Sequence, residues 1–189
     1  GATLHAAGLN LGGTAITADA TEMNYLDGVT SSIQTQIDAK GTASNVTGLS
    51  DALVEDNSIY IGNDPSSTTS TANYNVAVGI TTLDAITTGD NNTAIGYDAL
   101  TNNTEGESNT ASGYSALKYN TSGSGNTASG YGALEKNTEG NYNTASGSYV
   151  LTKNTEGKYN TASGYSALYS NTTGNYNVAI GNSALRYNK

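Results

Sequence analysis

The sequence has no cysteine, phenylalanine or tryptophan, and only one proline and one methionine among its 189 residues. The missing cysteine excludes disulfide bonds, a thiolate metal site and a cysteine nucleophile. Hydrophobic residues make up 35% of the chain, below the roughly 45–50% of an ordinary globular domain. A conventional core of large apolar side chains is therefore not expected.

Positive charge is also scarce. Seven Lys and Arg residues against 16 Asp and Glu give a formal net charge of −9. Nucleic acids and anionic membranes are bound through basic patches, so we expect this chain to bind neither. No apolar run approaches the roughly 18 residues that span a bilayer, and no signal peptide opens the chain. We expect no membrane insertion, and we expect the chain to be part of a longer protein.

Residues 1–57 form the first of two regions that the sequence predicts. Short apolar stretches around Leu4 and Leu9 are followed by Gly12-Gly13. Apolar stretches of this length that are bounded by glycine predict one short strand or a hairpin. The lone histidine, His5, lies here, so neither a catalytic triad nor a histidine metal site is expected.

Three short helices are predicted after this stretch. Asp19 and Glu22 form a capping box that begins the first helix. Residues 30–41 predict the second, with a hydroxyl cap at its start and glycine at its end. Residues 48–55 predict the third. We therefore expect a small α/β region.

An apolar seam runs through the first two predicted helices. Met23, Leu26, Thr30, Ile33 and Ile37 follow one another at spacings of three and four residues, as in a heptad repeat. A single helix of this size is marginal in water. We therefore predict that Met23, Leu26, Ile33 and Ile37 pack against partner helices from identical chains.

The second region, residues 58–189, repeats one phrase with a period of 17 residues. The phrase Asn-Thr-Ala-Ile-Gly-Tyr at residues 92–97 returns in register, with small changes, from Asn109, Asn126, Asn143, Asn160 and Asn177. Counting back to Ser58 gives eight copies, of which the last is incomplete. Disordered segments combine low hydrophobicity with high net charge, whereas only 12% of this chain is charged. The repeat favours a solenoid.

Each copy has the same internal order. An alternating segment with the period of a strand ends at a glycine, a second short segment centres on Ala-Leu, and a polar turn such as Asn137–Gly140 closes the copy. We predict two short strands and two turns per coil. Stacking the coils pairs equivalent strands in parallel at about 4.8 Å per layer. The predicted fold is an all-β repeat, a parallel β-roll of 17-residue coils.

The two faces of the first strand have different compositions. Side chains alternate along a strand, so Ala94 and its equivalents face one way while Thr93 and Ile95 face the other. We predict that the Ala side, with the Leu of the second segment, forms the interior. Such a coil is too thin to be stable alone, because apolar burial yields only about 25 cal/mol per Å² against roughly 1–2 kcal/mol per ordered residue.

The outward side of these strands is therefore predicted to pack between chains. It is aliphatic near both ends of the repeat and carries Thr and Ser in the middle. Packing of identical chains about a symmetry axis would cover such a face. The residues predicted to make this contact are Val76, Val78, Thr93, Ile95, Val178 and Ile180.

Asparagine and tyrosine recur at fixed positions and predict columns along the repeat. Asparagines from Asn109 to Asn160, and a second series from Asn120 to Asn171, are expected to bond between layers, as stacked amides do in cross-β structures. One tyrosine column is expected at Tyr97, Tyr114, Tyr131 and Tyr165. Another is expected at Tyr74, Tyr142, Tyr159 and Tyr176, and at least one column should be exposed.

These phrases resemble two known groups of proteins. Asn-Val-Ala-Ile-Gly and Asn-Thr-Ala-Ser-Gly resemble the head repeat of trimeric autotransporter adhesins of the YadA type, which implies a left-handed parallel β-roll in a homotrimer. Residues 16–30 (Ile-Thr-Ala-Asp-Ala-Thr-Glu-Met-Asn-Tyr-Leu-Asp-Gly-Val-Thr) and 33–38 (Ile-Gln-Thr-Gln-Ile-Asp) resemble a segment of tail-fibre proteins of tailed phages, notably marine and cyanobacterial ones. The two resemblances cover residues 9–189.

Together they imply a structural and adhesive segment of a homotrimeric phage tail fibre, located in the virion. Its expected partners are its own copies, other tail proteins and a host surface glycan. The same repeat leaves open the head of a bacterial adhesin on the cell surface. A glycan-degrading tailspike is the more remote alternative.

No enzymatic activity and no cofactor are expected. Glu139 and Glu156 occupy the same turn position in adjacent coils, superficially like a glycosidase carboxylate pair, but a solvated turn is the simpler interpretation. The Gly-Gly-x-Gly-x-Asp calcium repeat is absent, although oxygen ligands from several chains can still hold an ion on a shared axis. The tyrosines Tyr97, Tyr114, Tyr131 and Tyr165 are candidates for stacking on sugar rings.

Overall fold

The structure, a computed structural model, describes residues 10–11, 14–15, 52–55, 57–62, 65 and 71–188. The chain divides into two compact units, residues 1–44 and 45–189.

In the first unit, strands β1 (Asn10–Leu11) and β2 (Thr14–Ala15) pair antiparallel. The stretches around Leu4 and Leu9, from which we predicted one short strand or a hairpin, lie outside the described residues except for β1. The first two predicted helices and the seam of Met23, Leu26, Ile33 and Ile37 lie outside the described residues.

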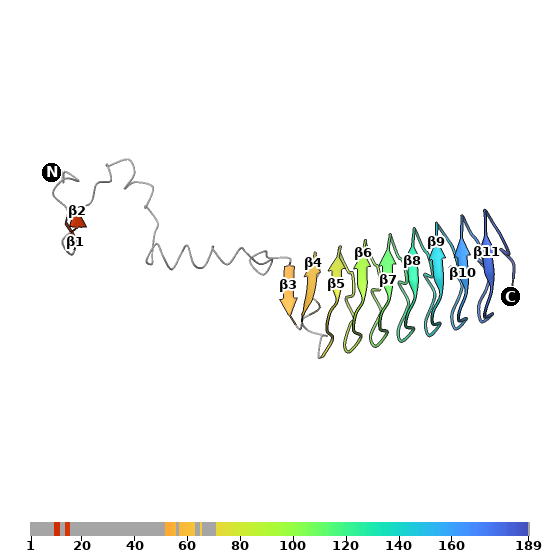
Figure 1. The fold of residues 1–189 in the computed structure, drawn as a ribbon, viewed down its shortest axis with the longest axis horizontal. Helices are drawn as coiled ribbons and strands as arrows, with labels where there is room; N and C mark the ends of the chain where they lie inside the picture. The colour runs from red at the N-terminus through yellow and green to blue at the C-terminus, as the bar shows by residue number, and fades with distance from the viewer. Residues whose placement is uncertain are drawn as a thin grey trace. The chain divides into compact units, whose positions relative to one another are not determined.

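The second unit is a parallel β-solenoid (Figure 1). Its described strands form one nine-stranded sheet in sequence order. From β4 onward each strand pairs in parallel with the next, and the register advances by one repeat, as in Ala94↔Ala111. The 17-residue coil is thereby confirmed. The strands are β3 (Ala52–Glu55), β4 (Ser58–Ile61), β5 (Val76–Val78), β6 (Thr93–Ile95), β7 (Thr110–Ser112), β8 (Thr127–Ser129), β9 (Thr144–Ser146), β10 (Thr161–Ser163) and β11 (Val178–Ile180).

Strand β3 corrects the helix that we predicted over residues 48–55. Ala52–Glu55 is extended and pairs antiparallel with β4, with Ala52 opposite Ile61 and Glu55 opposite Ser58. A helix of so few residues has little stability of its own. The edge of the first coil offers a full row of strand partners, and pairing with it protects that edge.

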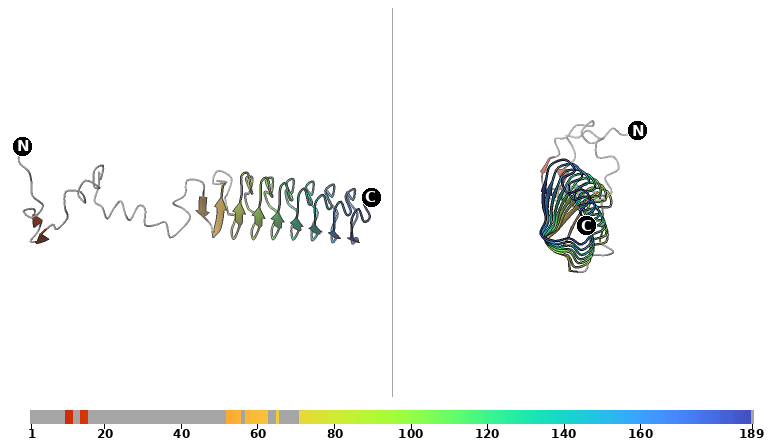
Figure 2. Two further views of the ribbon diagram at one scale, coloured as in Figure 1. Left: turned by 90° about the horizontal axis from the view of Figure 1, so that it is seen from above. Right: turned by 90° about the vertical axis from the view of Figure 1, so that its right-hand side faces the viewer.

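The interior of the solenoid is the narrow row of small side chains that the sequence predicts. Figure 2 shows the coils superimposed when the solenoid is seen end on. In every strand from β5 to β11 the middle alanine is buried, and so is the Leu that follows in six successive coils. In the first coil Tyr60 takes the alanine position and is also buried. The buried leucines are Leu83, Leu100, Leu117, Leu134, Leu151 and Leu168.

The second strand that we predicted in each coil is wrong. The Ala-Leu segment is a run of turns, because the Leu residues have φ between 49° and 53° and the residue two places earlier, such as Asp98, is also left-handed. Within the coil the Asn103 N–H donates to the Leu100 carbonyl, whereas the Leu100 N–H reaches the Ala116 carbonyl in the next layer. The segment thus turns a corner and still bonds between layers, while Leu100 remains buried.

Two asparagine ladders close the coils. In the first, the backbone N–H and the Nδ2 of Asn143 both donate to Asn126 Oδ1, at 3.0 and 3.1 Å. Asn160 makes the same two bonds to Asn143 Oδ1 at 3.0 Å. At the start of the solenoid the Ser58 hydroxyl replaces the amide and accepts from the Asn75 N–H at 2.9 Å. The predicted ladder is confirmed, and it extends from Asn75 to Asn177.

The second ladder meets the first at one carbonyl per coil. Asn137 Nδ2 donates to Asn120 Oδ1 at 2.7 Å and to the Gly140 carbonyl at 2.9 Å. Asn126 Nδ2 donates to the same Gly140 carbonyl at 2.8 Å. A carbonyl oxygen has two lone pairs, so both are used. This convergence holds the polar turn against the beginning of its own coil.

The turn glycine is required by space. Gly140 does not have a positive φ, but an added Cβ would lie 2.6 Å from the Gly157 carbonyl oxygen and even closer to Asn137 Oδ1. Gly132 differs: its φ is +60°, and an added Cβ would meet nothing closer than 3.4 Å. Other coils carry Asp98, Ser115 or Tyr149 at that position.

We predict that Asn143→Ala lowers the free energy of unfolding by about 2–4 kcal/mol. The change removes the acceptor of two buried donors of Asn160, and an unsatisfied buried polar group costs about 1–3 kcal/mol. Urea denaturation followed by circular dichroism measures the loss. The control is Asn182→Ala, an exposed asparagine that bonds only to its neighbour Ser183. Equal losses in the two variants would contradict the ladder's role.

Gly140→Ala should destabilise the protein by about 3 kcal/mol, because neither the neighbouring backbone nor the ladder amide can move without opening the stack. Gly132→Ala is the matched substitution. It should cost only about 1–2 kcal/mol, the strain of a left-handed alanine. Thermal unfolding of the two variants compares them directly, and a Gly132→Ala protein as unstable as Gly140→Ala would refute the packing argument.

Candidate functional site

The outward side of the sheet is the first candidate surface. We define the strand face as the outward-pointing side chains of β4 to β11. Its members form two columns in register, one through Val76, Thr93 and Thr110 and the other through Val78, Ile95 and Ser112. The columns end at Val178 and Ile180. The structure therefore gathers all six residues predicted for the solenoid's chain-to-chain contact onto one face.

The strand face is open in the single chain. Ile95 is 47% exposed, Val178 is 66% exposed and Ile180 is 74% exposed, whereas the alanine between each outward pair is buried. The middle strands β7 to β10 present Thr and Ser in the same columns. Contact with further chains through this face stays a prediction.

The first tyrosine column is exposed and stacked. The Tyr97 and Tyr114 ring centroids lie 5.2 Å apart, and those of Tyr114 and Tyr131 lie 5.0 Å apart with an interplanar angle of 4°. Rings stacked in this way cover each other's faces. The hydroxyl groups and ring edges are what remain for a ligand along this part of the column.

The column changes character at the coil of β9. Ser148 stands where a tyrosine is expected, and Tyr149 fills the space from the next position along the chain. Its ring makes edge contacts, with interplanar angles of 64° to Tyr131 and 84° to Tyr165. Burial, then the neighbouring Tyr131, raise the pKa of the Tyr149 phenol. Tyr165 therefore meets its neighbour at right angles, unlike the rings before the break.

The second column is shorter than we predicted. Tyr142, Tyr159 and Tyr176 stack with centroid distances of 5.2 and 5.1 Å. Tyr74 does not join them, because the intervening layers carry Asn91, Ser108 and Gly125 at this position. Gly125 lies beneath the Tyr142 ring, which an added Cβ would touch at 2.6 Å.

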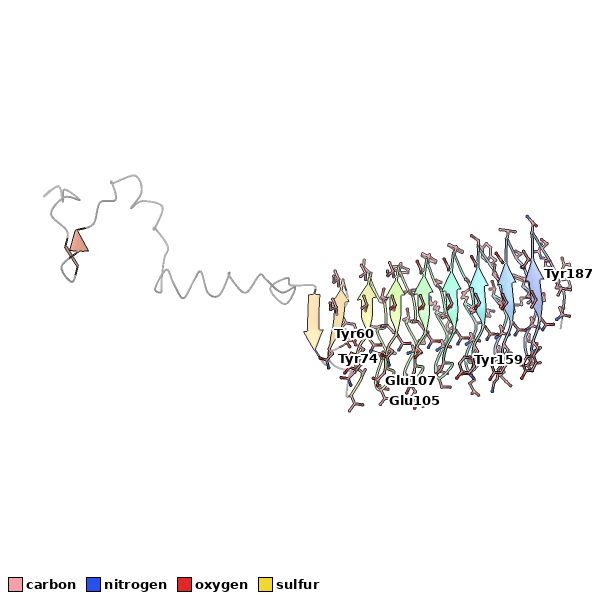
Figure 3. The ribbon with its side chains drawn as sticks, viewed as in Figure 1. Tyr60, Tyr74, Glu105, Glu107, Tyr159 and Tyr187 are labelled. Carbon is pink, nitrogen blue, oxygen red and sulfur yellow. The ribbon has the colours of Figure 1, made fainter. Side chains whose placement is uncertain are left out.

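A recess of about 330 Å³ lies beside the interruption of the first column. Tyr149, Tyr165, Ser166, Tyr169 and Arg186 line it. These side chains come from the turns that follow β9, β10 and β11. Figure 3 shows the neighbouring Tyr187 at the β11 end of the solenoid.

Two cations lie against one ring at this recess. Lys153 Nζ is 5.1 Å from the centre of the Tyr169 ring, and the Arg186 guanidinium carbon is 5.5 Å from it. Sequence reasoning missed this site. The signals that could have found it are the displaced tyrosine at Tyr149 and the basic and aromatic residues that share a corner of successive coils.

The acidic turns form a second recess of about 310 Å³. Glu139, Glu156, Lys158, Thr173 and Asn175 line it. Both glutamates are exposed. Glu105 and Glu107 lie along the lower edge of the solenoid in Figure 3, at the polar turns of their own coil. This arrangement resembles a solvated turn more than a catalytic cleft, and the absence of catalysis stays a prediction.

The ion pair of the described residues joins Lys118 to Asp98, with Nζ 2.6 Å from Oδ2. Burial opposes ionisation of Asp98, but hydrogen bonds from Lys118 and Thr81 outweigh it and hold the pKa of the carboxyl below its usual value. Asp98 is thus satisfied by structural partners from the coils on either side.

The described residues contain no group of three His, Cys, Asp or Glu side chains placed to hold a metal ion. Nor do they include a helix long and apolar enough to cross a bilayer.

Comparisons of the chain with models of known protein families, with curated proteins and with solved structures found no match.

Proposed function

We propose that this chain is a structural and adhesive segment of a homotrimeric phage tail fibre that takes part in host attachment. The observation that carries the proposal is the strand face. Large exposed apolar patches on a soluble protein mark interaction sites. Here valine and isoleucine alternate with buried alanine at both ends of a regular sheet, and the Thr and Ser of β7 to β10 lie between the two patches.

Packing around a three-fold axis accounts for the composition of this face. Valine and isoleucine columns would exclude water near the ends of the solenoid, while Thr and Ser hydroxyls between β7 and β10 would bond to one another or to bridging water. Each coil buries only small side chains of its own. Burial of the strand face would add the apolar area that a single thin coil lacks.

The attachment role draws on the rigidity of the solenoid and on the N-terminal phrase. A stack held by two amide ladders suits a part that transmits or presents a contact surface. The phrase at residues 16–30 resembles phage tail-fibre proteins, so the proposed location is the virion, with other tail proteins and a host surface glycan as partners. The 17-residue phrase resembles the heads of trimeric autotransporter adhesins, which makes a bacterial surface adhesin the alternative.

The proposed assembly predicts a solution mass of three times 19.2 kDa, about 58 kDa, by multi-angle light scattering. Ile95→Glu would place an unpaired charge in the interface, where its burial costs several kcal/mol, and should give the single-chain mass. The control is Ile80→Glu, which changes an isoleucine that is 64% exposed but lies on the turn after Gly79. Ile80→Glu should remain trimeric.

A single-chain mass for the unchanged protein would refute the trimer. So would equal dissociation of both variants, since the effect would then not belong to the strand face. Circular dichroism shows whether each variant keeps its β structure.

The location is tested by immunogold electron microscopy with antibodies raised against this chain. Labelling of tail fibres on purified virions is the expected result, and antibody that has been adsorbed with the protein is the control. Labelling of the surface of uninfected bacteria would instead support the adhesin alternative and contradict the phage assignment.

A further inference from the structure

We propose that the recess lined by Tyr149, Tyr165, Ser166, Tyr169 and Arg186 binds one acidic sugar residue of a glycan, meaning a sugar that bears a carboxylate. The inference rests on the attachment role proposed above and names a ligand class and a location for it. At about 330 Å³ the recess lies at the small end of the roughly 300–1,000 Å³ typical of ligand pockets. That size suits a single sugar ring better than a longer stretch of polymer.

Over the described ranges, neither Lys153 nor Arg186 has a carboxylate within ion-pair distance. Among the residues that the structure describes, the ion pair is the one between Lys118 and Asp98. Lys153 and Arg186 instead face the Tyr169 ring from the coils on either side of it. Arg186 also lies 5.6 Å from the Tyr187 ring. Two positive charges are thus brought together in a chain whose net charge is −9.

Arg186 also has a buried donor that is not used within the protein. Its Nε is buried and has no hydrogen-bond partner. A buried donor without a partner is costly, and the guanidinium fork matches a carboxylate with two parallel bonds. A carboxylate is therefore the group whose binding would satisfy Arg186.

The aromatic side of the recess differs from the rest of the column. Tyr114 has a parallel ring on each side, so its faces are covered. Tyr165 meets Tyr149 at 84°, and the next coil carries Asn182 at its position rather than another tyrosine. Tyr165 is 51% exposed. Its ring offers the apolar platform on which one side of a sugar can lie.

The cationic side of the recess, at Arg186, and its aromatic side, at Tyr165, together define the ligand. A simple anion such as phosphate would use Arg186 and leave the rings idle, whereas a neutral sugar would use the rings and leave the buried donor unsatisfied. A sugar carboxylate uses both, and its hydroxyl groups match the phenol hydroxyls of the tyrosines around it. Because the whole chain repels anions, binding must depend on the local cations and must weaken as salt is added.

The test is isothermal titration calorimetry of the full 189-residue chain with three probes: trigalacturonic acid, its methyl ester and inorganic phosphate. We expect trigalacturonic acid to bind and the ester to bind about tenfold more weakly, because the ester has lost the charge that pairs with Arg186. Arg186→Gln should weaken binding of the acid about tenfold. Lys136→Gln is the matched control, since it removes an exposed cation of the same corner outside the recess.

A second pair of variants tests the aromatic half. Tyr165→Leu should weaken binding of both the acid and the ester several-fold, because it removes the platform. Tyr97→Leu removes an exposed tyrosine at the other end of the column and should leave binding unchanged. Circular dichroism of each variant establishes that its β structure is retained.

Several outcomes would overturn the proposal. They are no binding of trigalacturonic acid, equal binding of acid and ester, equal effects of Arg186→Gln and Lys136→Gln, and binding of phosphate without binding of the sugar acid. The mass measurement of the proposed trimer is independent of all of them. If the protein is a trimer but does not bind the sugar acid, only the proposed binding site is refuted. If it is a single chain that binds the sugar acid, only the proposed trimer is refuted.

Discussion

Each buried asparagine amide of the two ladders bonds both to the equivalent asparagine one layer away and to a glycine carbonyl of its own coil, and that double requirement determines the rest of the coil. The two asparagine ladders converge on a single glycine carbonyl per coil, as at Gly140. The convergence leaves no room for a side chain on that glycine, and it fixes the length of the coil, because one residue more or less would separate the donors from the carbonyl. Alanine in the strand and leucine at the corner then fill what space remains. The two asparagine ladders determine the shape of the coil, and the apolar side chains fill the space that this shape leaves.

A fixed period has a further consequence for the outer surface. When every coil repeats in register, each outward position becomes a column, and its composition decides what the column can do. A position that repeats without change makes a uniform stripe, like the Thr and Ser pairs from β7 to β10. A position that changes makes a local feature at the layer where the change occurs. Ser148 interrupts the first tyrosine column, and the recess lies at that interruption.

The exact period made much of this fold predictable from the sequence. The strand positions, the inward alanine and the ladders follow from a phrase that never changes register. The Ala-Leu corner was not predictable in the same way, because its alternation imitates a strand, and Leu100 in a left-handed conformation carries none of the glycine signal that usually marks one. We did not predict β3 because this segment is extended only through its pairing with β4, a tertiary contact that outweighs a weak local preference for helix. The recess depends on how neighbouring rings are oriented, as with the tilted ring of Tyr149. The order of residues along a column does not predict the angle between two rings.

Repetition also bears on how strongly any one site needs to bind. In the proposed homotrimer the recess would occur three times, once per chain, at the same height along the axis. Sites on one rigid body face a polymeric glycan together, so that once the first is occupied, the next meets its sugar at a high effective concentration. Weak binding at each recess is then compatible with firm attachment, provided that the spacing of the acidic sugars can span the distance between chains. A rigid stack of identical coils helps here, because it holds those distances constant and spares the cost of ordering the binding surface on contact. The regular layers would supply the rigidity, and the layers around the interrupted tyrosine column would supply the recognition.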